Sequence, residues 1–188
     1  MPDISPIETV YNGYRFRSRL EARWAVFFDA AGIQYEYEPQ GFKLSDGTCY
    51  LPDFFLPDFK AYVEIKPIGI KPIDLENAKR KCESLFYGLN DIIVLLCLGD
   101  PSEDNIEVFC SDSTDSGGGE NWWNAHFFRT GKPAIGLLDS RDDREYFTSG
   151  WGEVVGVEQL THYTTHNSLI SAKTKARQAR FEHGEHGR

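Results

Sequence analysis

The sequence contains no long apolar run. No stretch of its 188 residues approaches the roughly 20 consecutive apolar residues that a membrane-spanning helix needs. Its first ten residues, MPDISPIETV, also lack the basic segment and the apolar segment of a secretory signal. We therefore expect a cytoplasmic protein without a membrane partner.

Cysteine is scarce. The four cysteines are scattered along the chain and form no Cys-x-x-Cys pair. They are Cys49, Cys82, Cys97 and Cys110. Structural zinc sites usually draw their cysteines from closely spaced pairs, so this spacing argues against zinc. We expect reduced thiols, most of them in the core, which agrees with a cytoplasmic location.

The sequence also lacks an excess of positive charge. A net charge of −9 argues against a simple binder of polyanions. The acid is concentrated in residues 99–170, which carry 4 Lys and Arg against 13 Asp and Glu, whereas residues 1–98 carry 11 against 14. Residues 171–188 carry 5 against 2 and include most of a predicted basic helix over 168–181. A nucleic-acid surface must therefore be local, and the acidic half suits a protein partner.

What the sequence does contain fits a globular domain with an appendage, because 40% of its residues are hydrophobic and 14% are aromatic. Asn12-Gly13 between β-forming residues predicts a hairpin. Apolar residues at helical spacing between Ser18 and Gly32 predict a helix. The remaining patterns predict strands over 33–38, 42–44, 49–55 and 61–66, a helix over 73–87, a buried strand over 91–98 and an edge strand over 106–110.

Two of the predicted strands carry charged residues in apolar surroundings. Pro52-Asp53 is followed, after ten residues, by Glu64-x-Lys66. A carboxylate in such surroundings is costly unless something pairs with it. Two carboxylates and a lysine on adjacent strands can form a site for a hard divalent cation. The alternative is a pair of surface carboxylates, with Glu64 and Lys66 forming a plain ion pair.

This pattern resembles the PD-(D/E)XK nuclease superfamily, which has the restriction-endonuclease-like fold, over roughly residues 10–98. The opening Arg17-Ser18-Arg19-Leu20-Glu21-Ala22-Arg23-Trp24 looks like the R-S-x-x-E-A-x-W opening of small phage-type members. The resemblance implies an α/β fold whose central mixed sheet is flanked by helices in the order α-β-β-β-α-β. It implies a nuclease core over 1–98, with the acidic insertion and C-terminal extension over 99–188 packed on it.

The resemblance also implies roles for individual residues. Asp53, Glu64 and the backbone carbonyl of Ile65 would hold Mg²⁺, with Mn²⁺ as a substitute. Lys66 would orient the attacking water or neutralise the phosphate. Glu21 would complete the metal shell, although Ser18-x-x-Glu21 also satisfies a helix capping box, which needs no function.

Two basic clusters bracket the predicted site. Arg15, Arg17, Arg19 and Arg23 precede it, and Lys71 and Lys79 follow it. Charge clusters are usually solvated faces, but their position on both sides of a metal site favours contacts with nucleic-acid phosphates.

The expected function is Mg²⁺-dependent hydrolysis of phosphodiester bonds in DNA, in the host cytoplasm if the protein is encoded by a phage. Two alternatives stay open. One is a nuclease fold used as a binding module that engages a host defence protein or a nucleic acid without cleavage, and the other is an RNA nuclease. The oligomeric state also stays open, including a homodimer.

Overall fold

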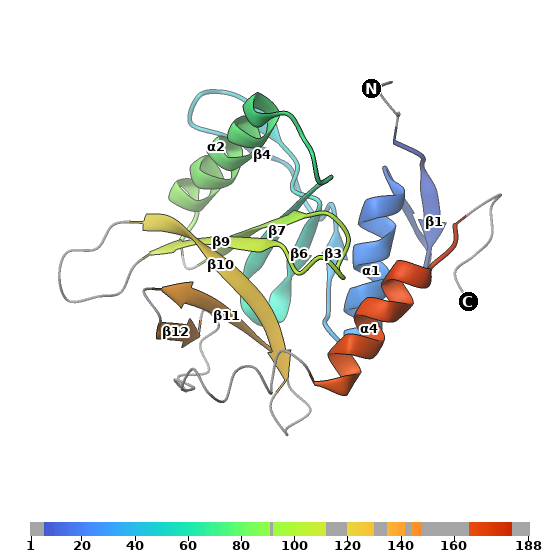
Figure 1. Ribbon diagram of the computed structural model, residues 1–188. Coiled ribbons are helices and arrows are strands. Elements are labelled where there is room, and N and C mark those ends of the chain that lie inside the picture. Colours follow the sequence, from blue (N-terminus) through green and yellow to red (C-terminus); the bar gives the residue numbers. More distant parts are fainter. Residues whose placement is uncertain are drawn as a thin grey trace.

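The computed structural model describes residues 6–90, 92–111, 120–129, 135–141, 144–147 and 166–181. Within these ranges the chain is an α/β protein with three α-helices, a mixed central sheet and two small two-stranded sheets (Figure 1). This confirms the predicted class and the mixed sheet. None of these helices is long and apolar enough to cross a membrane.

The elements follow each other along the chain as β1 (Thr9–Tyr11), β2 (Tyr14–Phe16), α1 (Arg19–Ala31), β3 (Glu36–Tyr37), β4 (Phe42–Lys43), β5 (Cys49–Tyr50), β6 (Phe54–Leu56), the 3₁₀ turn η1 (Pro57–Phe59), β7 (Ala61–Lys66), α2 (Pro72–Gly88), β8 (Ile93–Leu98), β9 (Ile106–Ser111), β10 (Glu120–Arg129), β11 (Ile135–Arg141), β12 (Arg144–Phe147) and α4 (Asn167–Gln178).

The central sheet has the strand order β12-β11-β10-β9-β8-β7-β6-β3. β7 and β8 are parallel, and all other neighbouring pairs in this sheet are antiparallel. Because parallel strands need a long crossover, α2 lies between them in the chain. β8 lies between β7 and β9, and five of its six residues are buried, as its apolar run predicts.

Local signals define the ends of the first helix. The hydroxyl of Ser18 accepts a hydrogen bond from the backbone N–H of Glu21 (3.2 Å), which caps the N-terminus of α1. Gly32 ends the helix at φ 76°, a backbone conformation that a side chain disfavours. The Asn12–Gly13 turn joins β1 to β2 as predicted.

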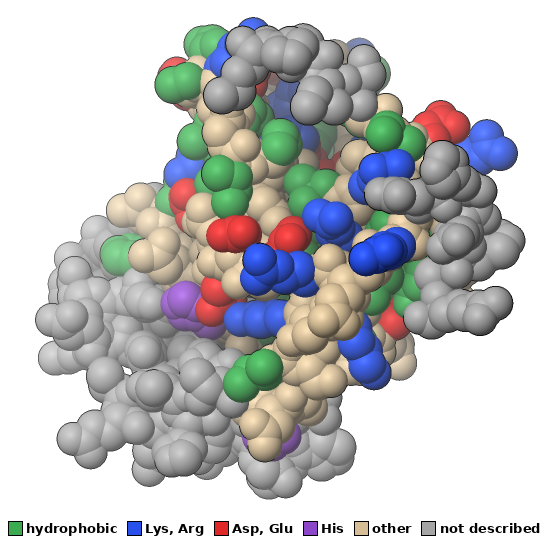
Figure 2. Space-filling model, turned by 45° about the vertical axis from the view of Figure 1, so that its right-hand side comes forward, with side chains coloured by type: hydrophobic (Ala, Val, Ile, Leu, Met, Phe, Trp, Pro, Cys, Tyr) green, Lys and Arg blue, Asp and Glu red, His purple; other side chains and the backbone are tan. Residues whose placement is uncertain are grey.

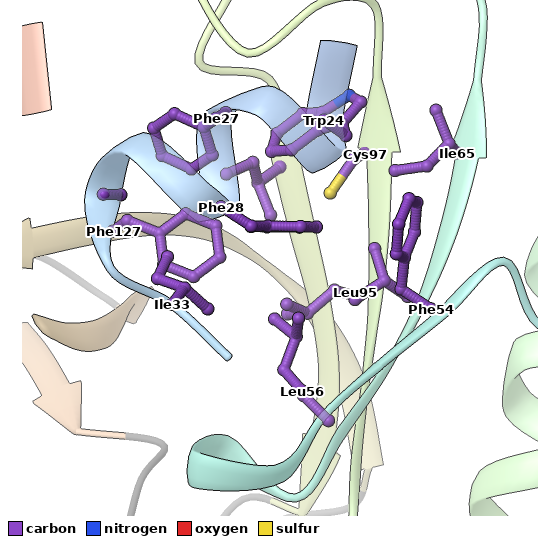
Figure 3. Packing of buried hydrophobic residues seen from close by; sticks show 14 of the residues in the cluster. Trp24, Phe27, Phe28, Ile33, Phe54, Leu56, Ile65, Leu95, Cys97 and Phe127 are labelled. Carbon is purple, nitrogen blue, oxygen red and sulfur yellow. The ribbon is translucent and has the colours of Figure 1, made fainter. Parts of the chain in front are cut away.

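α1 and α2 cover opposite faces of the central sheet (Figure 1). Trp24 and Phe28 of α1 are buried with Leu95 in one apolar cluster (Figure 3). Cys82 of α2 and Tyr62 of β7 belong to a second cluster on the other face. Each fully buried large apolar side chain stabilises the fold by about 1.5–3 kcal/mol, so both layers hold the sheet firmly.

The side chains of β7 alternate between these two faces. Val63 and Ile65 join the cluster under α1, whereas Tyr62 joins the cluster under α2. Glu64 and Lys66 therefore leave the strand on the α2 side, where their spacing of two residues predicts that they share a face.

The predicted strand over 49–55 is wrong as one continuous element. β5 pairs with β4 in a separate small sheet, and β6 pairs with β7 in the central sheet. The break falls at Pro52, which has no N–H to donate to a strand ladder. Backbone hydrogen bonds to the neighbouring segments resume at Asp53, whose N–H donates to the Val63 carbonyl (3.0 Å) and whose carbonyl accepts from the Glu38 N–H (3.0 Å).

The central sheet continues beyond residue 98. The strand expected at 106–110 on a sheet edge is an interior strand, because β9 pairs with both β8 and β10. α4, the predicted basic helix, lies beside α1 (Figure 1). Phe127 and Leu169 belong to the same apolar cluster as Trp24. The described parts of the two predicted regions thus share a core, and the boundary at residue 98 stays a prediction.

Candidate active site

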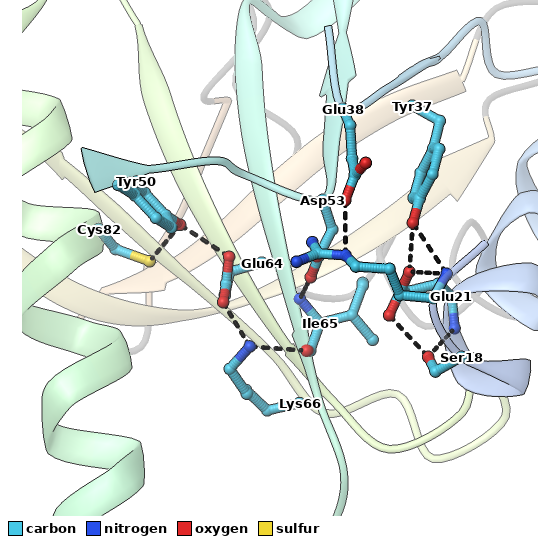
Figure 4. Close-up of polar contacts among 11 residues, drawn as sticks. Ser18, Glu21, Tyr37, Glu38, Tyr50, Asp53, Glu64, Ile65, Lys66 and Cys82 are labelled. Carbon is cyan, nitrogen blue, oxygen red and sulfur yellow. Dashed lines mark hydrogen bonds and ion pairs between the residues drawn. The ribbon is translucent and has the colours of Figure 1, made fainter. Parts of the chain in front are cut away.

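Asp53 and Glu64 lie side by side at the junction of β6 and β7 (Figure 4). Phe54 is opposite Val63 in this antiparallel pair, and the backbone N–H of Asp53, just before β6, donates to the Val63 carbonyl (3.0 Å). The Asp53 carboxylate accepts from the N–H of Ile65, the residue after Glu64, and the charge of Glu64 raises the pKa of Asp53. Both are buried, with exposed fractions of 3% for Asp53 and 6% for Glu64. The structure therefore brings together the two carboxylates that the sequence singles out.

Each oxygen of the Asp53 carboxylate has a donor. Oδ2 accepts a hydrogen bond from the backbone N–H of Ile65 (2.7 Å), and Oδ1 accepts one from Nη2 of Arg17 (2.7 Å). The Arg17 guanidinium also pairs with Glu38 through Nε (2.5 Å). About half of the Arg17 side chain is exposed, so it connects the buried carboxylate to solvent.

The Glu64 carboxylate is held from two sides. Its Oε2 accepts a hydrogen bond from the hydroxyl of Tyr50 (2.8 Å), and its Oε1 pairs with the ammonium group of Lys66. The same ammonium donates to the backbone carbonyl of Ile65 (3.2 Å). Lys66 is thus a positive charge shared by two of the oxygens that were predicted to bind metal.

Burial and neighbouring charges shift the proton equilibria of this site. Burial, followed by the negative charge of Glu64, raises the pKa of Asp53 to about 8, although Lys66 acts in the opposite direction. Burial alone would lower the pKa of Lys66, but the charges of Glu64 and Asp53 outweigh it and hold this pKa above its ordinary value. Burial, more than the neighbouring charges, therefore favours the neutral form of Asp53.

Glu21 is buried on α1 but is engaged in a network of its own. Its Oε1 accepts from the hydroxyl of Ser18 (2.7 Å), and its Oε2 accepts from the hydroxyl of Tyr37 (2.7 Å) and the backbone N–H of Arg17 (3.1 Å). The carboxylate therefore reaches the N–H of Arg17 and not that of Ser18, which a capping box would use. Arg17 links the two networks, because its guanidinium binds Asp53.

Sequence reasoning missed the two tyrosines that orient the carboxylates. Tyr50 contacts both Glu64 and the Sγ of Cys82 (3.6 Å), and burial raises the pKa of its hydroxyl well above the ordinary value. Burial and the hydrogen bond to Glu21 likewise raise the pKa of Tyr37. Both hydroxyls stay protonated at neutral pH and act as donors.

The first basic cluster divides between three places. Arg17 enters the site, whereas the exposed Arg15 lies 3.7 Å from the equally exposed Glu8. Arg19 and Arg23 line a groove between α1 and α4. Of this cluster, Arg17 alone contacts a predicted metal ligand through its side chain, within the described residues.

The second basic cluster is also divided. Lys71 is exposed at the N-terminus of α2. Lys79 pairs with Glu107 and lies over the ring of Trp122, 5.0 Å from its centre. Lys79 is therefore held by β9 and β10, and its predicted role in phosphate binding would require breaking this pair.

The donor chemistry of the site fits a hard divalent cation, although the side chains are not arranged around one. Among the described residues, no three His, Cys, Asp or Glu side chains are gathered so that they could hold one ion. Asp53, Glu64 and the Ile65 carbonyl supply oxygen donors of the kind that Mg²⁺ prefers. The Lys66 ammonium already occupies a position between the last two. A cation could replace it if Lys66 and Arg17 turned away.

No protein-family model and no curated protein matches this chain. The resemblance to PD-(D/E)XK nucleases therefore stays a prediction from the sequence motifs.

Proposed function

We propose that this protein is a divalent-metal-dependent nuclease of the PD-(D/E)XK type that hydrolyses phosphodiester bonds in DNA. The observation that carries the proposal is the proximity of Asp53 and Glu64, two buried carboxylates close enough for the charge of Glu64 to raise the pKa of Asp53, with Lys66 beside Glu64. A purely structural site gains little from two carboxylates that raise each other's energy, whereas a cation site needs them.

The order of elements supports the finer fold assignment. α1, β3, β6, β7, α2 and β8 follow each other along the chain, with a small additional sheet between β3 and β6. This order agrees with the α-β-β-β-α-β order that the resemblance implies. Asp53, immediately before β6, and Glu64, in β7, are the residues to which the resemblance assigns metal binding.

The residues of the chain divide the chemistry between them. Asp53, Glu64 and the Ile65 carbonyl would hold Mg²⁺, which when bound lowers the pKa of water and offsets charge on the phosphate. Lys66, once released from Glu64, can donate to a phosphate oxygen or to the attacking water. The half-exposed Arg17 can turn from Asp53 toward a neighbouring phosphate. The ligand role of Glu21 stays a prediction.

One observation favours a second candidate, a nuclease fold that binds without cleaving. Arg17 and Lys66 already neutralise the two carboxylates through direct ion pairs. A closed ion-pair network of this kind would hold the fold together without any metal, and the acidic residues after position 98 would serve a protein partner.

A cleavage assay separates these candidates. Supercoiled plasmid, linear duplex, single-stranded DNA and RNA would each be incubated with Mg²⁺, Mn²⁺ or Ca²⁺. We expect cleavage of DNA with the first two ions and binding without turnover in Ca²⁺. Asp53→Asn, Glu64→Gln and Lys66→Met should lose cleavage, whereas the exposed Asp58→Asn should retain it as a matched control. DNA binding without cleavage under every condition would favour the binding module, and cleavage of RNA alone would favour the RNA nuclease.

A further inference from the structure

A large basic groove runs between α1 and α4. Its volume is about 1250 Å³, and five of its lining residues are basic: Arg19 and Arg23 from α1, Lys173 and Arg177 from α4, and Arg180 just beyond α4. No Asp or Glu lines it among the residues that the structure describes. On the face where α4 comes forward, Lys and Arg side chains gather along this helix (Figure 2).

Most of this positive charge is not neutralised within the described residues. Lys173 pairs with Asp104 (2.8 Å), and Arg23 lies 3.8 Å from Asp100. The buried Nε atoms of Arg19 and Arg23 have no hydrogen-bond partner in the part of the chain that is described. In a protein whose net charge is −9, five basic residues in one groove form the local positive surface that a polyanion requires.

The groove is fixed to the candidate active site by buried hydrogen bonds. Nε1 of Trp24, on α1 next to Arg23, donates to the carbonyl of Gly99 (2.9 Å). The N–H of Gly99 in turn donates to the backbone carbonyl of Lys66 (2.8 Å). Two hydrogen bonds thus connect the groove-lining helix to the end of the strand that carries Glu64. A ligand in the groove would be held at a fixed distance from the site.

We propose that the α1–α4 groove binds the sugar–phosphate backbone of DNA beside the point of cleavage, and this inference rests on the proposed nuclease function. α4 has 12 residues, so at 1.5 Å per residue it runs for about 18 Å, the span of about five phosphates along one strand. The groove contributes affinity and orientation and carries no sequence information, because contacts to phosphates do not distinguish bases. It extends the DNA-binding surface well beyond Arg17.

The test is DNA binding by the full chain in Ca²⁺, measured by fluorescence anisotropy with duplexes that grow in steps of about five base pairs, the span of α4. The groove variant is Arg177→Glu with Arg180→Glu. The matched control is Lys175→Glu with Lys43→Glu, which changes the net charge equally at exposed positions outside the groove. Arg177→Gln with Arg180→Gln serves as a second variant, because acidic residues near the C-terminus of α4 oppose the helix dipole.

We expect the groove variant to bind the longer duplexes at least about tenfold more weakly, and its plot of log affinity against log salt to be shallower by about two units. The Gln variant should show about half of this loss of affinity on the logarithmic scale, and the control should bind like the wild type. Affinity for the shortest duplex should not change. Circular dichroism of each variant checks that α4 remains folded.

The assignment would be overturned if the groove and control variants bound DNA equally, or if the wild type did not bind DNA. RNA of the same length and anionic lipid vesicles are tested as alternative ligands. A larger loss of binding to RNA than to DNA, or a loss of binding confined to the vesicles, would also overturn it. Cleavage is measured separately with Mg²⁺. If the protein cleaves DNA but the groove variant binds like the control, the groove proposal is wrong and the nuclease proposal stands. If binding depends on the groove but the protein never cleaves, the nuclease proposal is wrong and the groove still binds DNA.

Discussion

The Asp53–Glu64 site and the α1–α4 groove place their charges in opposite surroundings. At the site, negative charges are buried and each has a donor or a cation beside it. In the groove, positive charges lie along an open surface, and several have no counter-charge within the described residues. Buried charges interact strongly and are screened little by salt, whereas exposed charges act collectively and weaken as salt rises.

The difference separates chemistry from affinity. A single substitution in a buried ion network leaves another charge without a partner and should change function greatly. One substitution in an open groove removes one contact among several. We therefore expect all-or-none effects at the site and graded, salt-dependent effects in the groove.

The largest expected effect comes from removing one carboxylate of the site. Asp53→Asn should lower cleavage at least about 1,000-fold, because residues of one catalytic unit act together. Adding Glu64→Gln should lower it little further. The melting temperature with and without Mg²⁺ gives a second readout, since only the wild type and Asp58→Asn should be stabilised by the ion. Normal cleavage by the double variant would show that Asp53 and Glu64 take no part in the reaction, and the contrast between the site and the groove would no longer hold.

The second effect is a pH dependence of stability that originates in the site. The pKa of Asp53 is raised to about 8, so the folded protein keeps a proton on this carboxyl that the unfolded chain has lost. Without metal, stability should therefore fall as pH rises from about 4, the ordinary carboxyl range, to about 8, and it should be least affected at the acid end.

Unfolding in urea across this pH range measures the effect. Asp53→Asn should flatten the dependence and be the more stable protein at the alkaline end. Mg²⁺ should also flatten it, because a cation favours the ionised carboxylate. An unchanged slope in Asp53→Asn would mean that another group titrates. Arg177→Gln with Arg180→Gln, which adds no group that titrates in this range, should keep the wild-type slope.

Parts of this arrangement could be read from the sequence because the signals are local. Asn12-Gly13, Ser18 and Gly32 act within a few residues of themselves, and the structure confirms the hairpin and the helix that they predict. The spacing of Glu64 and Lys66 requires only the two-residue repeat of a strand.

Other parts depend on pairing between distant segments, which no local pattern reveals. Pro52 is compatible with a strand that begins or bends, and only the pairing of β5 with β4 shows that the strand is interrupted there. Tyr50 looks like an ordinary core residue until β5 brings its hydroxyl to Glu64. The groove brings Arg19 and Arg177 together, although the strands of the central sheet lie between them in the sequence. When the sequence is read alone, the basic residues of the groove therefore fall into two unrelated clusters.

The third prediction concerns Tyr50, which is a positioning residue. Tyr50→Phe removes the hydroxyl that donates to Oε2 of Glu64, and the lost hydrogen bond to a charged group should cost about 1.5–3 kcal/mol of stability. Cleavage should fall about tenfold, because a less restrained Glu64 holds the cation less well. Tyr14→Phe is the control, since Tyr14 makes ring contacts within the described residues and lies away from Glu64.

A role in metal binding has a distinct signature. The Mg²⁺ concentration needed for half-maximal cleavage should rise in Tyr50→Phe, whereas a purely structural role would lower stability without moving it. Equal Mg²⁺ dependence in Tyr50→Phe and Tyr14→Phe would therefore assign Tyr50 to the core alone.

The smallest effect is expected at Glu21, where capping and metal binding compete. Three donors already occupy its carboxylate, and it is not gathered with Asp53 and Glu64 around a common point in the described residues. Glu21→Gln keeps an acceptor oxygen, so it should cost about 1 kcal/mol of stability through the weakened cap. Cleavage should stay within about tenfold of the wild type, in contrast to Asp53→Asn. Gln replaces a charged hydrogen-bond acceptor with a neutral one, and the weakening of one such hydrogen bond corresponds to a change of about this size. If Glu21→Gln instead abolished stabilisation by Mg²⁺ while melting normally without it, Glu21 would be a ligand. Arg17 donates to Glu21 through its backbone N–H and to Asp53 through its guanidinium. Its side chain would then have to turn away before these carboxylates could bind the ion.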